Sequence, residues 1–294
     1  MIANNKEFKM FSTLKYDSKD TNSLDVISSA LKDNGFYVIK NAVSIFEIDQ
    51  LVSEMEEILS ARNRRDVLFQ QHGSGRTLPI CDLQGDGKGA RFVDLMMSLV
   101  SAQKVLLNDK IVESLRQIFD ADPVLFQSLS FEYGSEQALH QDTAYVVTNP
   151  PMNLVGVWIA LEDIQSGSGE LKYAKGSHKL PYFFQEKTKK FHWNRDVDGD
   201  QLHSDYINFL EKAALDYPEI IIQNYLPKKG DALIWHSQLA HGGSQITNDS
   251  LTRKSLVGHF CPVGTLPNWA NTNRKPKVST VNPNAFIMSQ YNFE

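Results

Sequence analysis

The sequence predicts a mainly-β protein with flanking helices, in which many short strands form a sandwich or barrel behind an N-terminal helical region. Three observations lead to this class. From residue 122 onward, short β-branched and aromatic stretches follow one another, bounded by Gly, Pro, Asn or Asp. Apolar residues at helical spacing are concentrated before residue 120. Strands and helices do not alternate at every step, as a doubly wound α/β fold would require.

The N-terminal region is expected to contain a helix, a strand and a second helix. Apolar residues recur at helical spacing over residues 24–31, ahead of a β-branched and aromatic strand at 36–40. Ser44 and Glu47 form a capping box, which predicts a second helix running to about residue 61.

The remaining elements follow in chain order. Residues 62–90 are rich in Gly, Arg and Asp, and we expect a flexible loop at the rim of the substrate site. Helices are predicted at about 91–101, 109–119 and 203–215. Strands are predicted at 124–132, 140–147, 153–162, 169–174, 220–225, 231–237 and 253–260. A single domain over residues 1–294 is expected, with its helical layer at about 20–120 and its β core at about 122–265.

Composition and charge exclude several classes of protein. Hydrophobic residues make up 41% of the chain and charged residues 22%, an ordinary globular balance. The net charge of -5 argues against a nucleic-acid partner, and we interpret the KTKK run at 187–190 as a solvated loop face. No apolar stretch reaches the roughly 18 residues that span a bilayer, and Cys81 and Cys261 fit no zinc pattern. We therefore expect a cytoplasmic protein, monomer or homodimer, with a small-molecule substrate and no membrane partner.

The central chemical motif is the pair His140 and Asp142. In a strand, side chains two residues apart point to the same face, so this imidazole and carboxylate could bind one metal from adjacent corners. His241 is the candidate third ligand, because the two glycines after it would leave room for a ligand near the metal; His236 is the rival. A lone His-x-Asp pair is often only a surface histidine near an acid. Two histidines and one carboxylate leave three positions open, which suits iron(II) better than structural zinc.

Arg253 lies twelve residues beyond His241. The connection at 242–252 contains turn-forming Asn, Asp and Ser, so we expect the chain to return antiparallel. Arg253 would then lie on the strand beside the metal-bearing strand, inside the barrel. A guanidinium there could grip the distal carboxylate of 2-oxoglutarate with two parallel hydrogen bonds. The alternative is a surface arginine on an edge strand.

Five stretches carry a resemblance in both order and spacing. They are DNGFYVIKNAVSIFEIDQL (33–51), LHQDTAYV (139–146), LVGVWIALEDIQSGSGELKYAKGSHK (154–179), KGDALIWHSQLAHGGSQ (229–245) and TRKSLVGHF (252–260). With these stretches the chain resembles the phytanoyl-CoA dioxygenase family of iron(II)- and 2-oxoglutarate-dependent oxygenases over about residues 24–265. The resemblance implies a double-stranded β-helix core, also called a jelly-roll or cupin-like core, with an N-terminal helical layer.

The resemblance also implies residue roles. Iron(II) is assigned to His140, Asp142 and His241. Contacts with 2-oxoglutarate are implied for Arg253, Trp158 and Gln127. Some relatives have a co-substrate-binding serine two residues after the distal histidine; this chain has Gly243 there, which puts that contact in doubt. His178, in the GSH landmark of the family, is expected to be structural.

The family's chemistry converts 2-oxoglutarate and O2 to succinate and CO2, and a ferryl species then hydroxylates a small organic substrate. Halogenating relatives have Gly or Ala in place of Asp142, so its carboxylate favours hydroxylation over halogenation. Desaturation, cyclisation or epoxidation would use the same cofactors. A non-catalytic jelly-roll binding protein and a metal-dependent hydrolase or isomerase are the other classes considered. Substrate-pocket residues are expected to be Tyr145, Trp235 and the segments 62–90 and 182–203.

Overall fold

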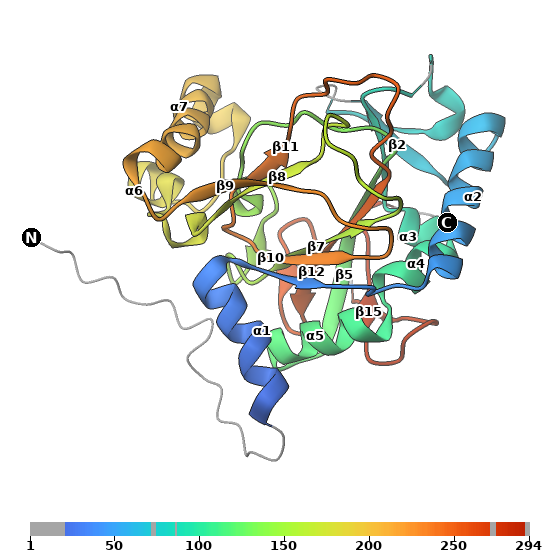
Figure 1. Cartoon of the computed structure of the whole chain (residues 1–294), viewed down its shortest axis with the longest axis horizontal. Helices are drawn as coiled ribbons and strands as arrows, with labels where there is room; N and C mark the ends of the chain where they lie inside the picture. The colour runs from blue at the N-terminus through green and yellow to red at the C-terminus, as the bar shows by residue number, and fades with distance from the viewer. Residues whose placement is uncertain (1–20, 72–74, 86, 271–274, 292–294) are drawn as a thin grey trace, which may run out of the picture.

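A computed structural model describes residues 21–71, 75–85, 87–270 and 275–291 of the chain (Figure 1). Its helices are α1 (Thr21–Asn34), α2 (Ile45–Ala61), α3 (Leu95–Ser98), α4 (Val100–Leu106), α5 (Asp109–Phe119), α6 (Phe183–Thr188) and α7 (Arg195–Asp216). The first strands are β1 (Phe36–Ile39), β2 (Leu68–Gln71), β3 (Thr77–Pro79), β4 (Ala90–Val93), β5 (Pro123–Phe131), β6 (Thr148–Asn149), β7 (Val155–Ala160) and β8 (Leu171–Lys175). The later strands are β9 (Ile221–Tyr225), β10 (Ala232–His236), β11 (His241–Gly243), β12 (Ser255–Pro262), β13 (Leu266–Pro267), β14 (Lys277–Val278) and β15 (Phe286–Ile287).

Two sheets form the β core. Within the described residues, the large sheet has the order β1-β10-β7-β12-β5-β4-β2-β3, and β15 adds a parallel strand beside β5. The small sheet has the order β11-β8-β9. Figure 1 shows the small sheet lying over the middle of the large one, with α1 and α3–α5 on the other side of the large sheet. This mainly-β arrangement with flanking helices agrees with the predicted class.

The two faces of the large sheet pack against different partners. On β7, Val157 and Ile159 face the helices and belong to the main apolar core, together with Leu51 of α2. Trp158, between them in sequence, faces the opposite side and packs with residues of the small sheet such as Tyr173. Because both faces are buried, β7 is apolar at nearly every position, without the polar alternation of a half-exposed strand. The helices therefore fix the sheet from outside and leave its inner face for a site.

The N-terminal region contains more strand than expected. Residues 62–90 are not a loop, because β2 pairs with both β3 and β4. The helix predicted at 91–101 is wrong at its start, where β4 joins β2 to β5. Phe92 is buried in that strand, and Asp94, with a positive φ of 50°, ends it before α3 and α4 begin. Tertiary pairing thus overrides the helical spacing of the apolar residues.

Most of the other predicted elements are confirmed. The helix at 109–119 has the predicted bounds, and the helix at 203–215 lies inside the longer α7. Six of the seven predicted strands occur with ends shifted by at most two residues. The exception is 140–147, which forms one bridge and then a turn of 3-10 helix at Asp142–Ala144. Among the helices of the described residues, none has the length and apolar character needed to cross a bilayer.

Candidate metal centre and its cavity

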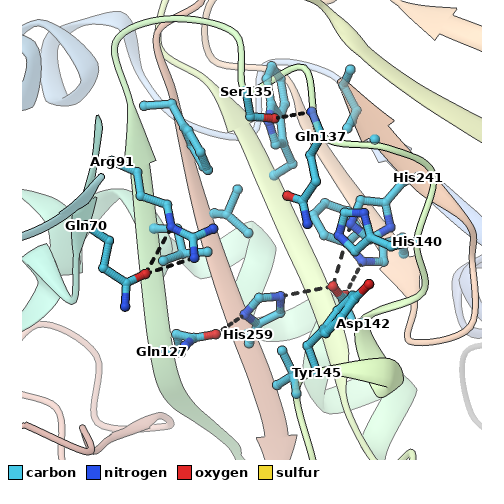
Figure 2. Close-up of a pocket in the computed structure, with 18 of the residues that line it drawn as sticks. Gln70, Arg91, Gln127, Ser135, Gln137, His140, Asp142, Tyr145, His241 and His259 are labelled. Atoms are coloured by element: carbon cyan, nitrogen blue, oxygen red, sulfur yellow. Dashed lines mark hydrogen bonds and ion pairs between the residues drawn. The ribbon is translucent and has the colours of Figure 1, made fainter. Parts of the chain in front are cut away.

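His140 and His241 face each other across an isolated β-bridge. The backbone N–H of each donates to the carbonyl of the other at 2.9 Å, and the ring centroids lie 4.4 Å apart. Asp142 follows at the start of the 3-10 turn, so a bridge and a turn, and not a regular strand, bring it beside the rings. Ligand atoms of the three residues lie within 4.8 Å of one another (Figure 2). The three predicted ligands therefore converge, as the sequence indicated.

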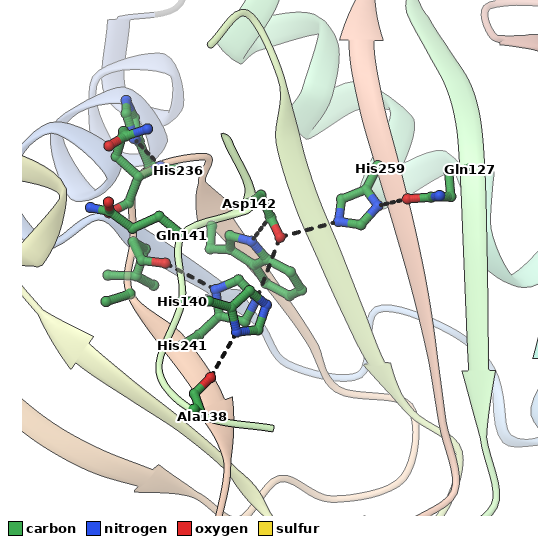
Figure 3. A network of polar contacts seen from close by, with 12 residues as sticks. Gln127, Ala138, His140, Gln141, Asp142, His236, His241 and His259 are labelled. Carbon is green, nitrogen blue, oxygen red and sulfur yellow. Dashed lines mark hydrogen bonds and ion pairs between the residues drawn. The ribbon is translucent and has the colours of Figure 1, made fainter. Parts of the chain in front are cut away.

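Backbone carbonyls fix the orientation of both imidazoles. The Nδ1 atoms of His140 and His241 lie 2.9 Å from the carbonyl oxygens of Ala138 and Leu239 (Figure 3). Nδ1 acts as the donor to a carbonyl, which leaves the lone pair on Nε2 for a metal. Burial lowers the pKa of His140 to about 3, so this ring is neutral near pH 7, as ligation requires.

The carboxylate of Asp142 has a different partner on each oxygen. Oδ2 accepts a hydrogen bond of 2.6 Å from the indole N–H of Trp235. Oδ1 lies 3.6 Å from Nε2 of His241 and 3.5 Å from Nε2 of His259. Burial by itself would raise the pKa of Asp142, but the two histidines outweigh burial and hold that pKa below its ordinary value. Asp142 is therefore ionised and presents one oxygen toward the histidines.

These donors match one kind of metal centre. Two imidazoles and one carboxylate are buried together, and they adjoin a cavity of about 390 Å³. Among the described residues that line this cavity, Asp142 is the only carboxylate and no cysteine is present. Such a set occupies one face of an octahedron and leaves positions open, which suits non-haem iron(II). A structural zinc site would instead be closed by a fourth protein ligand.

Arg253 lines the same cavity, is buried, and forms no ion pair within the described residues. Its Nη1 donates to Ser255 Oγ at 2.6 Å, while its Nε has no hydrogen-bond partner. The indole N–H of Trp158 also has no hydrogen-bond partner. The centroid of this ring lies 6.0 Å from the guanidinium carbon of Arg253. Burial lowers the pKa of Arg253 to about 10, so it remains a cation at neutral pH. Two buried donors without partners, one of them charged, are suited to the carboxylate of a bound ligand.

The route by which Arg253 reaches the cavity differs from the expected one. It was expected beside the metal-bearing strand, but β11, which carries His241, pairs with β8 in the small sheet. β12, which follows Arg253, pairs with β5 and β7 in the large sheet. The connection crosses from one sheet to the other, so the expected hairpin is wrong. Arg253 and the histidine belong to different walls of one cavity.

His259 is a cavity residue that the sequence reasoning missed. Its Nδ1 lies 2.8 Å from Oε1 of Gln127, which was expected to contact the co-substrate and which also lines the cavity. Its Nε2 faces Asp142, so the three side chains form a chain of polar contacts (Figures 2 and 3). Residues 255, 257 and 259 of β12 share one face, and Arg253 lies two residues before the strand begins. Counting by twos from Arg253 would have found this histidine.

Tyr145 and Trp235 were both expected in the substrate pocket, and both line the cavity. The ring of Tyr145 lies 5.7 Å from that of His140, and its hydroxyl is 2.6 Å from Nε2 of His203 on α7. Among the described residues, none from 182–203 lines the cavity, and His203 contacts it only through Tyr145. The substrate role of this segment stays a prediction. Trp235 has a further contact, because its N–H is bound to Asp142.

His236 and the glycines after His241 have structural explanations. His236 is buried, and its Nδ1 accepts a hydrogen bond of 3.0 Å from the backbone N–H of Gln238. It stands outside the group of ligand atoms. A Cβ on Gly242 would lie 2.5 Å from the carbonyl oxygen of Gln137. The missing side chain at Gly242 thus lets a neighbouring backbone segment pack closely, while Gly242 also lines the cavity. The expected room for a metal-bound ligand stays a prediction.

A jelly roll with two histidines, a carboxylate and an unpaired arginine around one cavity has the features of the iron- and 2-oxoglutarate-dependent oxygenases. The family model described as Phytanoyl-CoA dioxygenase (PhyH) matches residues 31–255, and the chain belongs to this family. The predicted family is thereby confirmed.

The curated relatives are distant. The peroxisomal phytanoyl-CoA dioxygenase of Bos taurus is 25% identical over 241 residues, which cover 78% of this chain and 66% of the relative. Phytanoyl-CoA dioxygenase domain-containing protein 1 of Danio rerio is 28% identical over 152 residues, which cover 50% of this chain and 48% of the relative. The chain thus spans about half to two thirds of the length of these relatives.

Solved structures confirm the fold. The non-haem α-ketoglutarate-dependent epimerase SnoN from nogalamycin biosynthesis superposes with a TM-score of 0.60 at 14% identity, covering 90% of this chain and 97% of SnoN. AviO1 from Streptomyces viridochromogenes superposes with a TM-score of 0.52 at 16% identity, covering 85% of this chain and 99% of AviO1. At such identities the likeness establishes the jelly-roll core and nothing finer. SnoN has been crystallised with Fe3+, α-ketoglutarate and nogalamycin RO.

Proposed function

We propose that this chain is an iron(II)- and 2-oxoglutarate-dependent dioxygenase that hydroxylates a small organic molecule. The observation that carries the proposal is that a buried guanidinium with an unpartnered Nε and no ion pair lines the same cavity as the open cluster of metal ligands. An unpaired cation inside a protein is costly, so a site that retains one is built for an anion. A molecule with a carboxylate at one end and a metal-chelating keto acid at the other satisfies both requirements.

The roles of the residues follow from their contacts. Iron(II), when bound, supplies the oxygen-activating redox chemistry. The Nε2 atoms of His140 and His241 and Oδ1 of Asp142 would hold the ion. Arg253 and Trp158 would bind the distal carboxylate of 2-oxoglutarate, which directs its keto-acid end toward the metal. The buried walls exclude water from the reacting groups. We further propose that the chain acts as one domain, since the helices and the large sheet share a core.

Hydroxylation is the outcome that we propose. The carboxylate of Asp142 occupies the ligand position that a halide would need. Desaturation, cyclisation or epoxidation would use the same residues with a differently placed substrate. A metal-dependent hydrolase or isomerase would not need O2, so the dependence of turnover on O2 and 2-oxoglutarate separates these classes from the oxygenase that we propose.

Metal binding, co-substrate binding and succinate release test the proposal separately. Wild-type protein should bind Mn(II), then bind 2-oxoglutarate, and with iron(II) and O2 should release succinate slowly without substrate. His140→Ala should lose metal binding and succinate release. Arg253→Gln should retain metal binding but raise the Kd for 2-oxoglutarate about 30-fold or more, because a buried charge pair is broken. Arg116→Gln, which removes a surface arginine outside the cavity lining, serves as the matched control. Wild-type succinate release by His140→Ala would refute the assignment.

A further inference from the structure

A second guanidinium enters the cavity from another wall. Arg91 lies on β4 directly opposite Phe131 of β5, so its side chain is on the inner face of the large sheet. Its Nε and Nη2 both donate to Oε1 of Gln70, at 3.3 and 2.9 Å. Within the described residues, Arg91 forms no ion pair. The cavity thus contains a cation that a neutral amide orients but does not neutralise (Figure 2).

Once the other charges of the loaded site are balanced, the positive charge of Arg91 remains. This charge balance rests on the proposed function. The two positive charges of iron(II) and the one of Arg253 equal the negative charges of Asp142 and doubly ionised 2-oxoglutarate. The loaded site is therefore neutral before Arg91 is counted. A partly buried guanidinium beside a neutral, water-poor site has no counter-ion unless the remaining ligand supplies one.

The surroundings of Arg91 form a place for the remaining ligand. Gln70, Ser135 and Gln137 line the metal cavity together with Arg91, and all four also line an adjoining cavity of about 530 Å³. Figure 2 shows the amide of Gln137 directed into the space between Arg91 and the histidines. Besides Arg91, the charged residues that line the adjoining cavity are Lys88, Glu136 and Asp249, and neither acid forms an ion pair with Arg91. A substrate could therefore reach from the metal to Arg91 and extend outward.

We propose that the organic substrate bears a carboxylate and that Arg91, oriented by Gln70, binds it. The planar guanidinium fork matches a carboxylate, and a single negative charge balances the single excess cation. A phosphate monoester would bring nearly two charges and leave the site negative. The polar lining beside Arg91 also favours a compact acid over a long hydrocarbon chain.

Matched acids and amides test this inference. Protein loaded with Mn(II) and 2-oxoglutarate is titrated with phenylacetate, benzoate, cinnamate and 4-methylpentanoate, and with the primary amide of each, by calorimetry. In the wild type, at least one acid should bind about tenfold more tightly than its amide, as a charge-assisted contact implies. Arg91→Gln should abolish the preference, and Arg91→Lys should retain part of it, because the charge remains without the fork.

The controls separate this inference from the proposed function. Arg116→Gln removes a charge from a surface arginine that pairs with Asp122, and it should keep the acid preference. The Kd for 2-oxoglutarate should change by no more than about twofold in Arg91→Gln. A tenfold weaker Kd would assign Arg91 to the co-substrate and overturn the inference. Equal binding of every acid and its amide would also overturn it, while normal 2-oxoglutarate binding and succinate release in the same protein would leave the proposed function standing.

Discussion

At the scale of single residues, the metal centre is defined by what holds each ligand. Carbonyl oxygens fix both imidazoles, and the indole of Trp235 holds one oxygen of Asp142. An oxygen engaged in a 2.6 Å hydrogen bond is a poor second ligand, so Asp142 should bind a metal through Oδ1 alone. Trp235 also lies against His241, with ring centroids 4.7 Å apart. One indole therefore positions two of the three ligands.

The contacts of Trp235 make a substitution informative. Trp235→Phe keeps an aromatic ring but removes the N–H that holds Asp142. We expect the Kd for Mn(II) or Co(II) to rise roughly 10- to 100-fold, as for other residues that orient metal ligands. Calorimetric titration measures this Kd, and thermal unfolding of the metal-free variant reports whether the core is intact. A metal Kd equal to that of the wild type, with the core intact, would show that Asp142 needs no such support.

Asp94 predicts a pH dependence of stability. It is buried, with Oδ1 accepting from the backbone N–H of Ser128 at 2.7 Å and Oδ2 from Ser289 Oγ at 2.5 Å. Burial raises its pKa from 3.8 to about 6, so the folded state binds this proton more tightly than the unfolded state. The carboxyl therefore costs stability increasingly as pH rises from about 4 to 6, by at most about 3 kcal/mol.

Asp94→Asn should remove that dependence, because an amide can keep both contacts and does not ionise. The free energy of unfolding of the variant minus that of the wild type should become more positive from pH 5 to pH 7.5. Urea unfolding at the two pH values measures the difference. A constant difference between the proteins at both values would mean that Asp94 does not titrate in this range.

Among single residues, the ligands were predictable and two neighbours were not. His140, Asp142 and His241 could be found because few side chains bind metals and their order matched a known pattern. Arg91 was missed because a helix was predicted from residue 91, where β4 lies. His259 lies at an even spacing from Arg253 on the predicted strand, but its partners Gln127 and Asp142 come from other elements and could not be predicted.

At the scale of elements, the errors share one cause. The segment 140–147 has the composition of a strand but finds only His241 as a bridge partner. Residues 90–93 have apolar spacing suited to a helix, yet they form a strand because they pair with β2 and β5. α5 was predicted with its bounds because its signals are local, including the cap in which Asn108 accepts from the N–H of Lys110. Local signals are readable from the sequence, whereas available strand partners are not.

The pairing of β7 with β10 yields a test at this scale. Gly156 lies opposite Trp235, and a Cβ on Gly156 would lie 2.2 Å from the indole. Gly156→Ala should displace the ring, destabilise the protein by about 1–3 kcal/mol and weaken metal binding. Adding Trp235→Leu removes the clashing ring, so the double variant should be more stable than the sum of the two single effects predicts. Additive free energies of unfolding would mean that the strands adjust without strain.

At the scale of the whole molecule, one sheet separates a dry core from a cavity. The helices bury the outer face of the large sheet, and their residues form the largest group in the main apolar cluster. The inner face contains donors without partners, such as Arg253 Nε and Trp158 Nε1. The strands could be predicted from their composition, but the crossing between sheets that brings Arg253 to the histidines could not, because no local signal encodes it. Stability thus comes mainly from the helical side, and the cavity side is unsatisfied until ligands bind.

Ligands should therefore stabilise the entire fold. A ligand that binds only the native state at about 100 times its Kd adds about 2.7 kcal/mol. For a chain of this size, each kcal/mol raises Tm by roughly 2–4 °C, so Mn(II) and 2-oxoglutarate together should raise Tm by on the order of 10 °C. The rise in Tm caused by 2-oxoglutarate should require the metal, because the keto-acid end has no other strong partner in the cavity. Arg253→Gln should lose that increment while keeping the one from Mn(II). Differential scanning calorimetry resolves the two increments. An equal increment from 2-oxoglutarate with and without metal would place its binding site away from His140, Asp142 and His241.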